Sequence, residues 1–156
     1  DLHSTSRRQR QMCIRDSEVL AAKISSLLRD QGKFAVLYMA WLPQEDETAG
    51  KSEELVLKYH PLWTGCGETR HKIQIPKVYM DYFDIESEEV FDLEVPFTRE
   101  TWNGRMKACR GIGAALPEEE VAAFEEEHMR LLRQTAPQEF CVLHYAAVTV
   151  LRKKAE

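Results

Sequence analysis

The sequence has few cysteines, and they do not form the closely spaced pairs found in metal sites. There are four in 156 residues: Cys13, Cys66, Cys109 and Cys141. This pattern is typical of a reducing compartment, so we expect a cytoplasmic protein. Cys109 and Cys141 lack the flanking pattern of a nucleophile and are expected to be buried, structural thiols. Cys66 shares a stretch with His60 and His71, but their separations are unlike those of zinc sites. The sequence therefore predicts no bound metal.

The sequence also lacks long hydrophobic runs and an excess of basic residues. No apolar stretch reaches the length of a membrane span, and none near the start resembles the core of a signal peptide. The 21 Lys and Arg are outnumbered by 26 Asp and Glu, which gives a formal net charge of −5. A mildly acidic chain binds nucleic acid poorly unless its basic residues cluster. We therefore expect neither a membrane nor a nucleic-acid partner.

The only basic cluster of this kind lies in residues 1–17, which carry four arginines and almost no apolar periodicity. Residues 12–17, MCIRDS, resemble a peptide that arises when sequencing-adapter DNA is translated. A disordered basic arm that binds nucleic acid and an Arg- and Ser-rich transit peptide are the alternatives. We expect residues 1–17 to be a non-native or disordered lead segment and residues 18–156 to form the domain.

The domain begins with a helix followed by a buried strand. Apolar residues recur at helical spacing over residues 18–29, and Gly32 stands where a helix C-cap is expected. Residues 34–39 are apolar at nearly every position, which is typical of a strand covered on both faces. Helix, turn and central strand form the repeating unit of an open α/β sheet. No glycine-rich strand-to-helix turn precedes this unit, so we expect the C-terminal half of a nucleotide- or cofactor-binding domain.

The remaining residues predict an insertion, two strands and further helices. Residues 44–72 read as an insertion with a helix over 52–59 capped by Ser52. The other expected elements are helices over 75–83, 99–110 and 117–135 and strands over 90–95 and 140–151. Thr98 is the expected N-cap of the helix that follows it. The last two strands are expected to lie antiparallel at an edge of a mostly parallel sheet.

Three blocks of sequence resemble the C-terminal half of class I S-adenosylmethionine-dependent methyltransferases. Residues 27–41, LLRDQGKFAVLYMAW, resemble the turn that enters strand five, although Asp30 and Gln31 replace the usual proline and glycine. Residues 95–116, VPFTRETWNGRMKACRGIGAAL, resemble a segment after strand six in bacterial methyltransferases of unassigned substrate. Residues 140–154, FCVLHYAAVTVLRKK, resemble the final strand. The second block is the most specific.

The resemblance implies a Rossmann-like seven-stranded sheet with an antiparallel edge strand. It also implies transfer of a methyl group from S-adenosylmethionine to a small-molecule acceptor. The family binds this cofactor through an acidic-Gly-x-Gly loop, an acidic residue after strand two and the loop after strand four. None of these has a counterpart here, so no cofactor-binding or catalytic residue can be assigned. The chain alone is expected to be inactive, with the cofactor bound by a full-length parent.

Five residues are candidates for substrate binding. In open α/β sheets, ligands bind beyond the carboxyl ends of the strands, and Trp41 follows the first strand. Trp102, Arg105 and Arg110 lie near helical spacing after the second strand, and either arginine could hold an anionic group. The alternative is that Trp41 is packed under the insertion, that Trp102 is a core residue, and that the arginines are solvated or pair with acidic residues of the next helix.

His71 completes the set, because it lies in the insertion where substrate selectivity could reside. Either His71 or His60 could act as a general base. His144, on the final strand, is expected to be buried and structural. The Gly111-Ile112-Gly113 sequence follows a helix rather than a strand, and it therefore predicts a turn rather than a dinucleotide site.

A non-enzymatic module that binds a small ligand or a protein is the alternative function. Its binding surface would be formed by aromatic residues of the insertion and the segment after it, namely Tyr59, Trp63, Tyr79 and Tyr82. In either case the first strand would have an unpaired edge if no further strand covers it. Such an edge predicts aggregation or dimerisation.

Overall fold

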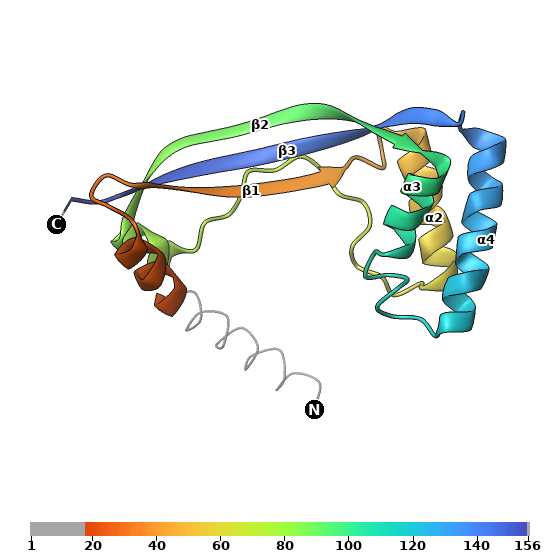
Figure 1. Cartoon of the computed structure of the whole chain (residues 1–156), viewed down its shortest axis with the longest axis horizontal. Helices are drawn as coiled ribbons and strands as arrows, with labels where there is room; N and C mark the ends of the chain where they lie inside the picture. Colours follow the sequence, from red (N-terminus) through yellow and green to blue (C-terminus); the bar gives the residue numbers. More distant parts are fainter. Residues whose placement is uncertain (1–17, 156) are drawn as a thin grey trace. The chain divides into compact units, whose positions relative to one another are not determined.

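The computed structural model describes residues 18–155 and shows a mixed α/β chain with a three-stranded open sheet (Figure 1). The strands are β1 (Lys33–Trp41), β2 (Phe83–Thr98) and β3 (Glu139–Lys153). The expectation of a disordered or non-native lead segment falls on residues outside the described range. The α/β class is confirmed, whereas seven strands are not seen in the part of the chain that the structure describes.

Helices connect and flank the strands. A helix over residues 18–27 precedes β1. It is followed by α2 (Glu47–Tyr59), the short 3-10 helix η1 (Lys77–Asp81), α3 (Arg99–Lys107) and α4 (Glu118–Thr135). No helix in the described part of the chain is both long and apolar enough to cross a membrane.

The final strand is antiparallel to both of its neighbours. Its end pairs with the start of β1 through Lys153 N and Gly32 O at 2.8 Å, and its start pairs with the end of β1 through Leu42 N and Leu143 O at 3.0 Å. β3 is paired with β2 in the same antiparallel way, because the end of each strand is hydrogen-bonded near the start of the other. Because both β1 and β2 run opposite to β3, their carboxyl ends point the same way along the sheet.

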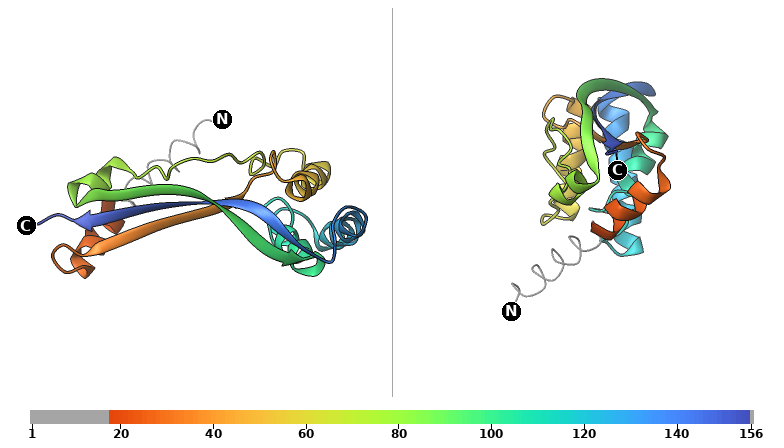
Figure 2. Two further views of the ribbon diagram at one scale, coloured as in Figure 1. Left: turned by 90° about the horizontal axis from the view of Figure 1, so that it is seen from above. Right: turned by 90° about the vertical axis from the view of Figure 1, so that its left-hand side faces the viewer.

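The expected position of the antiparallel strand at an edge is wrong, because β3 lies between β1 and β2 (Figure 2). β3 is apolar along most of its length and is buried or half-buried from Val142 to Leu151. Such a strand is suited to a central position, where both edges are hydrogen-bonded. β2 instead carries six acidic residues and a proline in FDIESEEVFDLEVPFT. That composition is typical of an edge strand.

The chain divides into two compact units, and every strand passes from one into the other. Unit 1 comprises the described residues up to Tyr38, His71–Val90 and Ala147 onward. Unit 2 comprises Met39–Arg70 and Phe91–Ala146.

Unit 1 has a small core between the sheet and the first helix. The stripe predicted for that helix places Ala21, Ile24 and Leu28 against the core residues Phe83 and Leu151. The turn after the helix differs from the prediction. Gln31 takes the left-handed conformation, with φ of 61°. Gly32 is instead needed for close approach, because a Cβ atom there would lie 2.7 Å from the carbonyl oxygen of Arg29.

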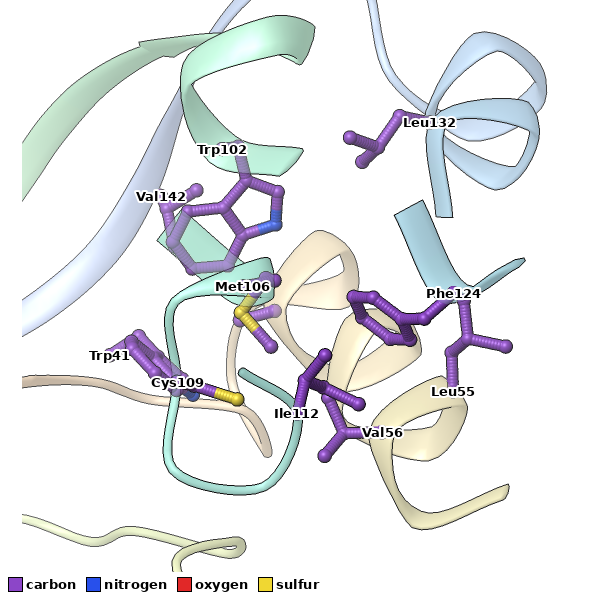
Figure 3. Packing of buried hydrophobic residues seen from close by; sticks show 11 residues of the cluster. Trp41, Leu55, Val56, Trp102, Met106, Cys109, Ile112, Phe124, Leu132 and Val142 are labelled. Carbon is purple, nitrogen blue, oxygen red and sulfur yellow. The ribbon is translucent and has the colours of Figure 1, made fainter. Parts of the chain in front are cut away.

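Unit 2 has the larger core, which lies among α2, α3 and α4 (Figure 3). Its largest fully buried side chains include Trp102, Phe124, Met106, Ile112 and Leu132. Gly111 and Gly113 lie in a turn, as expected. A Cβ atom on Gly111 would lie 2.7 Å from Val56 Cγ1, so this turn packs directly on α2.

Several element boundaries differ from the predictions because of side-chain capping and strand pairing. Asp46, not Ser52, is the N-cap of α2, and its Oδ1 accepts from Ala49 N at 2.8 Å. Its Oδ2 accepts from Leu143 N, which ties the cap to β3. Thr98 caps α3 as expected. Pairing with β3 extends β2 far beyond the predicted residues 90–95.

Candidate functional site

Trp41, at the carboxyl end of β1, is the centre of an aromatic cluster in unit 2. Its indole Nε1 donates to Glu53 Oε1 at 2.6 Å, and only 8% of the residue is exposed. Its ring meets that of Trp102 edge-on at 5.6 Å between centroids. The hydrogen bond and the ring contact together leave the indole a single orientation.

Trp102 forms the buried side of this cluster. It lies in the first turn of α3, its side chain is fully buried, and its Nε1 donates to Ser52 Oγ at 2.9 Å. Phe97 and His144 complete the cluster, with their rings 4.9 Å and 6.3 Å from that of Trp102. Trp102 is therefore a core residue, as the alternative to a substrate-binding role predicted, and it shapes the cluster from within the core.

Arg105 lies on the solvent side of the cluster. One helical turn after Trp102, it places its guanidinium carbon 4.8 Å from the centroid of the Trp41 ring. Attraction between the cation and the aromatic face holds the side chain there. Three of the five candidate residues, Trp41, Trp102 and Arg105, are thus brought together from the ends of β1 and β2.

His144 is the titratable group inside the cluster. Its ring stacks on Phe97 at 6.0 Å, and its Nδ1 lies 2.9 Å from the carbonyl oxygen of Val142. Burial lowers the pKa of His144, and the nearby positive charge of Arg105 acts in the same direction. The expected burial and hydrogen bonding of His144 are confirmed, and its ring is uncharged near neutral pH.

Glu53 supports the cluster and was missed by the sequence analysis. Its carboxylate is buried and accepts from Trp41 Nε1 and from Gly67 N, the latter at 2.8 Å. It therefore ties β1 to the loop after α2. In the sequence this glutamate is indistinguishable from the other acidic residues of its helix, because its partners lie outside that helix.

Arg110 and His71 are not part of this cluster as described. Arg110 is exposed in the turn after α3 and makes no hydrogen bond or ion pair with another described residue. His71 belongs to unit 1, where its ring lies 5.4 Å from that of Tyr38 and borders a shallow pocket of about 390 Å³. His60, the other candidate base, has its Nδ1 3.1 Å from the carbonyl oxygen of Gly111. That contact joins α2 to the turn after α3.

A buried polar network joins the three helices of unit 2. His128 of α4 has Nδ1 2.7 Å from Asn103 Oδ1 and Nε2 2.9 Å from Ser52 Oγ. The amide oxygen can only accept, so Nδ1 carries a hydrogen. Burial lowers the pKa of His128 to about 4. The ring is therefore neutral, and its Nε2 lies 2.9 Å from the Ser52 hydroxyl, which also donates to the Thr48 carbonyl oxygen at 2.7 Å.

These three residues have the order of contacts of a nucleophile, a base and an orienting group. However, Ser52 and His128 are 0% exposed and Asn103 is 4% exposed. No substrate carbonyl can reach the hydroxyl, which also accepts the indole N–H of Trp102. The network is therefore structural, and one of its effects is to orient Trp102.

An open groove of about 530 Å³ borders the cluster at Phe97. It is also lined by Thr98 and Thr101 at the start of α3 and by Phe140 and Cys141 of β3. The described residues thus offer an aromatic surface and a cation on unit 2. They hold no group of three His, Cys, Asp or Glu that could bind a metal.

The comparisons with known proteins add no assignment. No protein-family model matches the chain, and the curated proteins include no significant match.

Proposed function

We propose that the chain is the C-terminal part of an S-adenosylmethionine-dependent methyltransferase domain and that unit 2 binds the small-molecule methyl acceptor. The observation that carries the proposal is the convergence of Trp41 and Arg105. Trp41 stands at the carboxyl end of β1 and Arg105 on the helix that follows β2. β1 and β2 run in the same direction on either side of the antiparallel β3, so both residues stand at the same end of the sheet.

Two features of the fold support the family resemblance. The helix over residues 18–27 precedes β1, and the last strand is antiparallel, which agrees with the order expected for strands five to seven. The most specific block, residues 95–116, forms the end of β2, α3 and the turn at Gly111. That block contributes Phe97, Trp102 and Arg105 to the cluster.

The described residues do not fit S-adenosylmethionine. The turn from β1 into α2 contains no glycine, and neither does the direct passage from β2 into α3. No acidic-Gly-x-Gly loop occurs in residues 18–155. We therefore assign no residue of this chain to the cofactor. Its proposed contribution is to bind and orient the acceptor, which an aromatic wall and a cation can do.

The test is to express the entire reading frame that contains residues 18–156 and to measure its binding of S-adenosylhomocysteine by calorimetry. Methyl transfer from labelled S-adenosylmethionine to a mixture of small acids and amines is the second readout. We expect binding and transfer by that product and neither by residues 18–156 alone. Failure of the whole product to bind S-adenosylhomocysteine would overturn the methyltransferase proposal.

The second candidate is a ligand-binding module without catalysis. Two observations favour it. The cluster is preorganised, and the described part of the chain holds no loop that could bind the cofactor. Of the residues expected to form its surface, Tyr59 and Trp63 lie in unit 2, and Tyr79 and Tyr82 lie in unit 1. The module would bind its ligand through Trp41 and Arg105. It predicts ligand binding by residues 18–156 whether or not the whole product binds S-adenosylhomocysteine.

A further inference from the structure

Arg105 is an exposed cation that is held in position by a fixed aromatic surface. Its guanidinium lies 4.8 Å from the ring of Trp41. That ring cannot rotate away, because its Nε1 is bonded to the buried carboxylate of Glu53 at 2.6 Å. A stacked guanidinium keeps its N–H donors in the plane of the group, directed outward from the ring.

Arg105 has no ion-pair partner among the described residues, which sets it apart from half of the other eight Lys and Arg residues of unit 2. Four of the others are paired: Lys51 with Glu47, Lys58 with Glu127, Lys107 with Glu125, and Arg70 with both Glu45 and Asp92. Arg105 remains without one although acidic residues outnumber basic ones. The two oxygens of nearby Glu53 instead accept from Trp41 and Gly67.

The charge of Arg105 acts on its surroundings. It contributes to lowering the pKa of His144, and it also opposes the rise that burial causes in the pKa of the Cys109 thiol. Asp46 and Glu53 act in the opposite direction on the pKa values of His144 and Cys109, respectively. A planar guanidinium without an acidic partner suits a ligand with an anionic group.

We infer that Arg105, held against the ring of the buried Trp41, binds the anionic group of the ligand, a carboxylate or a phosphate. The inference deepens the proposed function, on which it rests for the place of the site, by making the methyl acceptor an organic acid or phosphate ester. The ligand must approach the guanidinium from the side away from the ring of Trp41.

The experiment follows the indole N–H signals of residues 1–156 by nitrogen-15 NMR, with the Trp41 signal assigned from Trp41→Phe. The probes are benzoate, phenyl phosphate and the neutral benzamide, each up to about 10 mM, a range in which single ion-pair ligands are detected. We expect a saturable shift of the Trp41 signal with benzoate or phenyl phosphate and none with benzamide. The anion that binds more tightly shows whether the site prefers a carboxylate or a phosphate.

Arg105→Gln should weaken binding of the anion by about tenfold or more, because a charge-assisted bidentate contact is lost. Arg105→Lys should retain part of the affinity. Arg110→Gln, an exposed arginine of the same segment, is the matched control and should bind as the unaltered chain does. Equal binding by Arg105→Gln and Arg110→Gln, or no saturable shift with either anion, would overturn the inference.

These outcomes are independent of the cofactor. Anion binding without S-adenosylhomocysteine binding by the whole reading-frame product would retain the site and support the ligand-binding module. Cofactor binding without any effect of Arg105→Gln on the probes would retain the methyltransferase proposal and reject the anionic acceptor.

Discussion

At the scale of single residues, the hydroxyl of Ser52 joins the three helices of unit 2. It lies 2.9 Å from Trp102 Nε1 and 2.9 Å from His128 Nε2, so one small side chain of α2 contacts both α3 and α4. All described buried side-chain polar atoms of the chain have hydrogen-bond partners. Loss of this hydroxyl would leave two nitrogen atoms without one.

Ser52→Ala is therefore expected to lower the free energy of unfolding by about 1–3 kcal/mol, the cost of leaving buried polar groups unsatisfied. Urea denaturation followed by tryptophan fluorescence measures this loss. Ser26→Ala is the matched control. Ser26 is exposed, and its hydroxyl bonds only locally to the Lys23 carbonyl oxygen. Equal effects of the two changes would show that the network contributes nothing specific.

His128 makes the stability of the chain depend on pH. Its pKa is about 4 in the folded protein and 6.5 in the unfolded chain, so the unfolded chain binds the proton first as the pH falls. Stability is therefore complete above pH 6.5 and decreases between pH 6.5 and about 4. The loss is about 3 kcal/mol for this residue. The lowered pKa of His144 acts in the same direction.

The measurement is urea denaturation at several values between pH 7.5 and 5, a range above the titration of most carboxylates. His128→Gln keeps a side chain that can donate and accept but cannot take up a proton. We expect a smaller change of stability with pH in this variant. An unchanged pH dependence would mean that His128 is not the group responsible.

At the scale of elements, a glycine of α3 and a glycine of the turn after it differ in how closely they pack against other residues. Gly104 lies within α3, where a Cβ atom would meet nothing within 4 Å. At Gly111 the Cβ atom would lie 2.7 Å from Val56 Cγ1 and 2.9 Å from the ring of Trp63. The first glycine only weakens a helix, whereas the second permits the turn to pack on α2.

We expect Gly104→Ala to stabilise the protein by about 0.5–1 kcal/mol, because alanine loses less conformational entropy in a helix. Gly111→Ala should destabilise it by about 1–3 kcal/mol through overpacking. Thermal unfolding of the two variants, which carry the same chemical change, measures both effects. A stabilising effect at Gly111 would mean that the contact with Val56 is not tight.

The two edge strands differ in their protection against association. β2 has six acidic residues, whereas β1, KFAVLYMAW, has a single charge, at Lys33. Leu37 of β1 is 73% exposed. Exposed apolar edge strands associate with one another, and charged residues prevent this.

Leu37→Lys is expected to reduce concentration-dependent association of the chain, as measured by sedimentation velocity. Val90→Lys is the matched change on β2, where Val90 is 37% exposed and the strand is already charged. It should alter association less. Association that is equal in both variants and in the unaltered chain would exclude the edge of β1 as its cause.

At the scale of the whole molecule, the three strands connect the two units through the backbone. Each strand contributes hydrogen-bonded residues to both units, so neither can lose its part of the sheet without affecting the other. We therefore expect a single cooperative unfolding transition. All three tryptophans, Trp41, Trp63 and Trp102, lie in unit 2. Their fluorescence thus reports on that unit alone.

Circular dichroism reports on the secondary structure of both units, so the two methods provide a direct test. Their urea unfolding curves should coincide if the chain unfolds in one step. Separated curves would show that the units unfold independently. In that case Ser52→Ala, which lies in unit 2, would shift the fluorescence curve and only that part of the circular dichroism curve that comes from unit 2.

The sequence by itself determined the local features of this protein. The stripe of the first helix, the cap at Thr98 and the existence of β1 and β3 follow from residues that are close together in the chain. These patterns show which face of an element is apolar and where the element ends. They also led to Trp41, Trp102 and Arg105, because both segments follow a predicted strand.

Only the tertiary structure decided which of these elements meet. It placed β3 between the other strands rather than at an edge, it assigned His71 to unit 1 and the cluster to unit 2, and it left Arg110 exposed in the turn after α3. It also paired Trp41 with Glu53, 12 positions away, and Ser52 with His128, 76 positions away. An apolar pattern requires that a side chain be buried, but it does not specify a partner. Partners are selected when many elements pack at once.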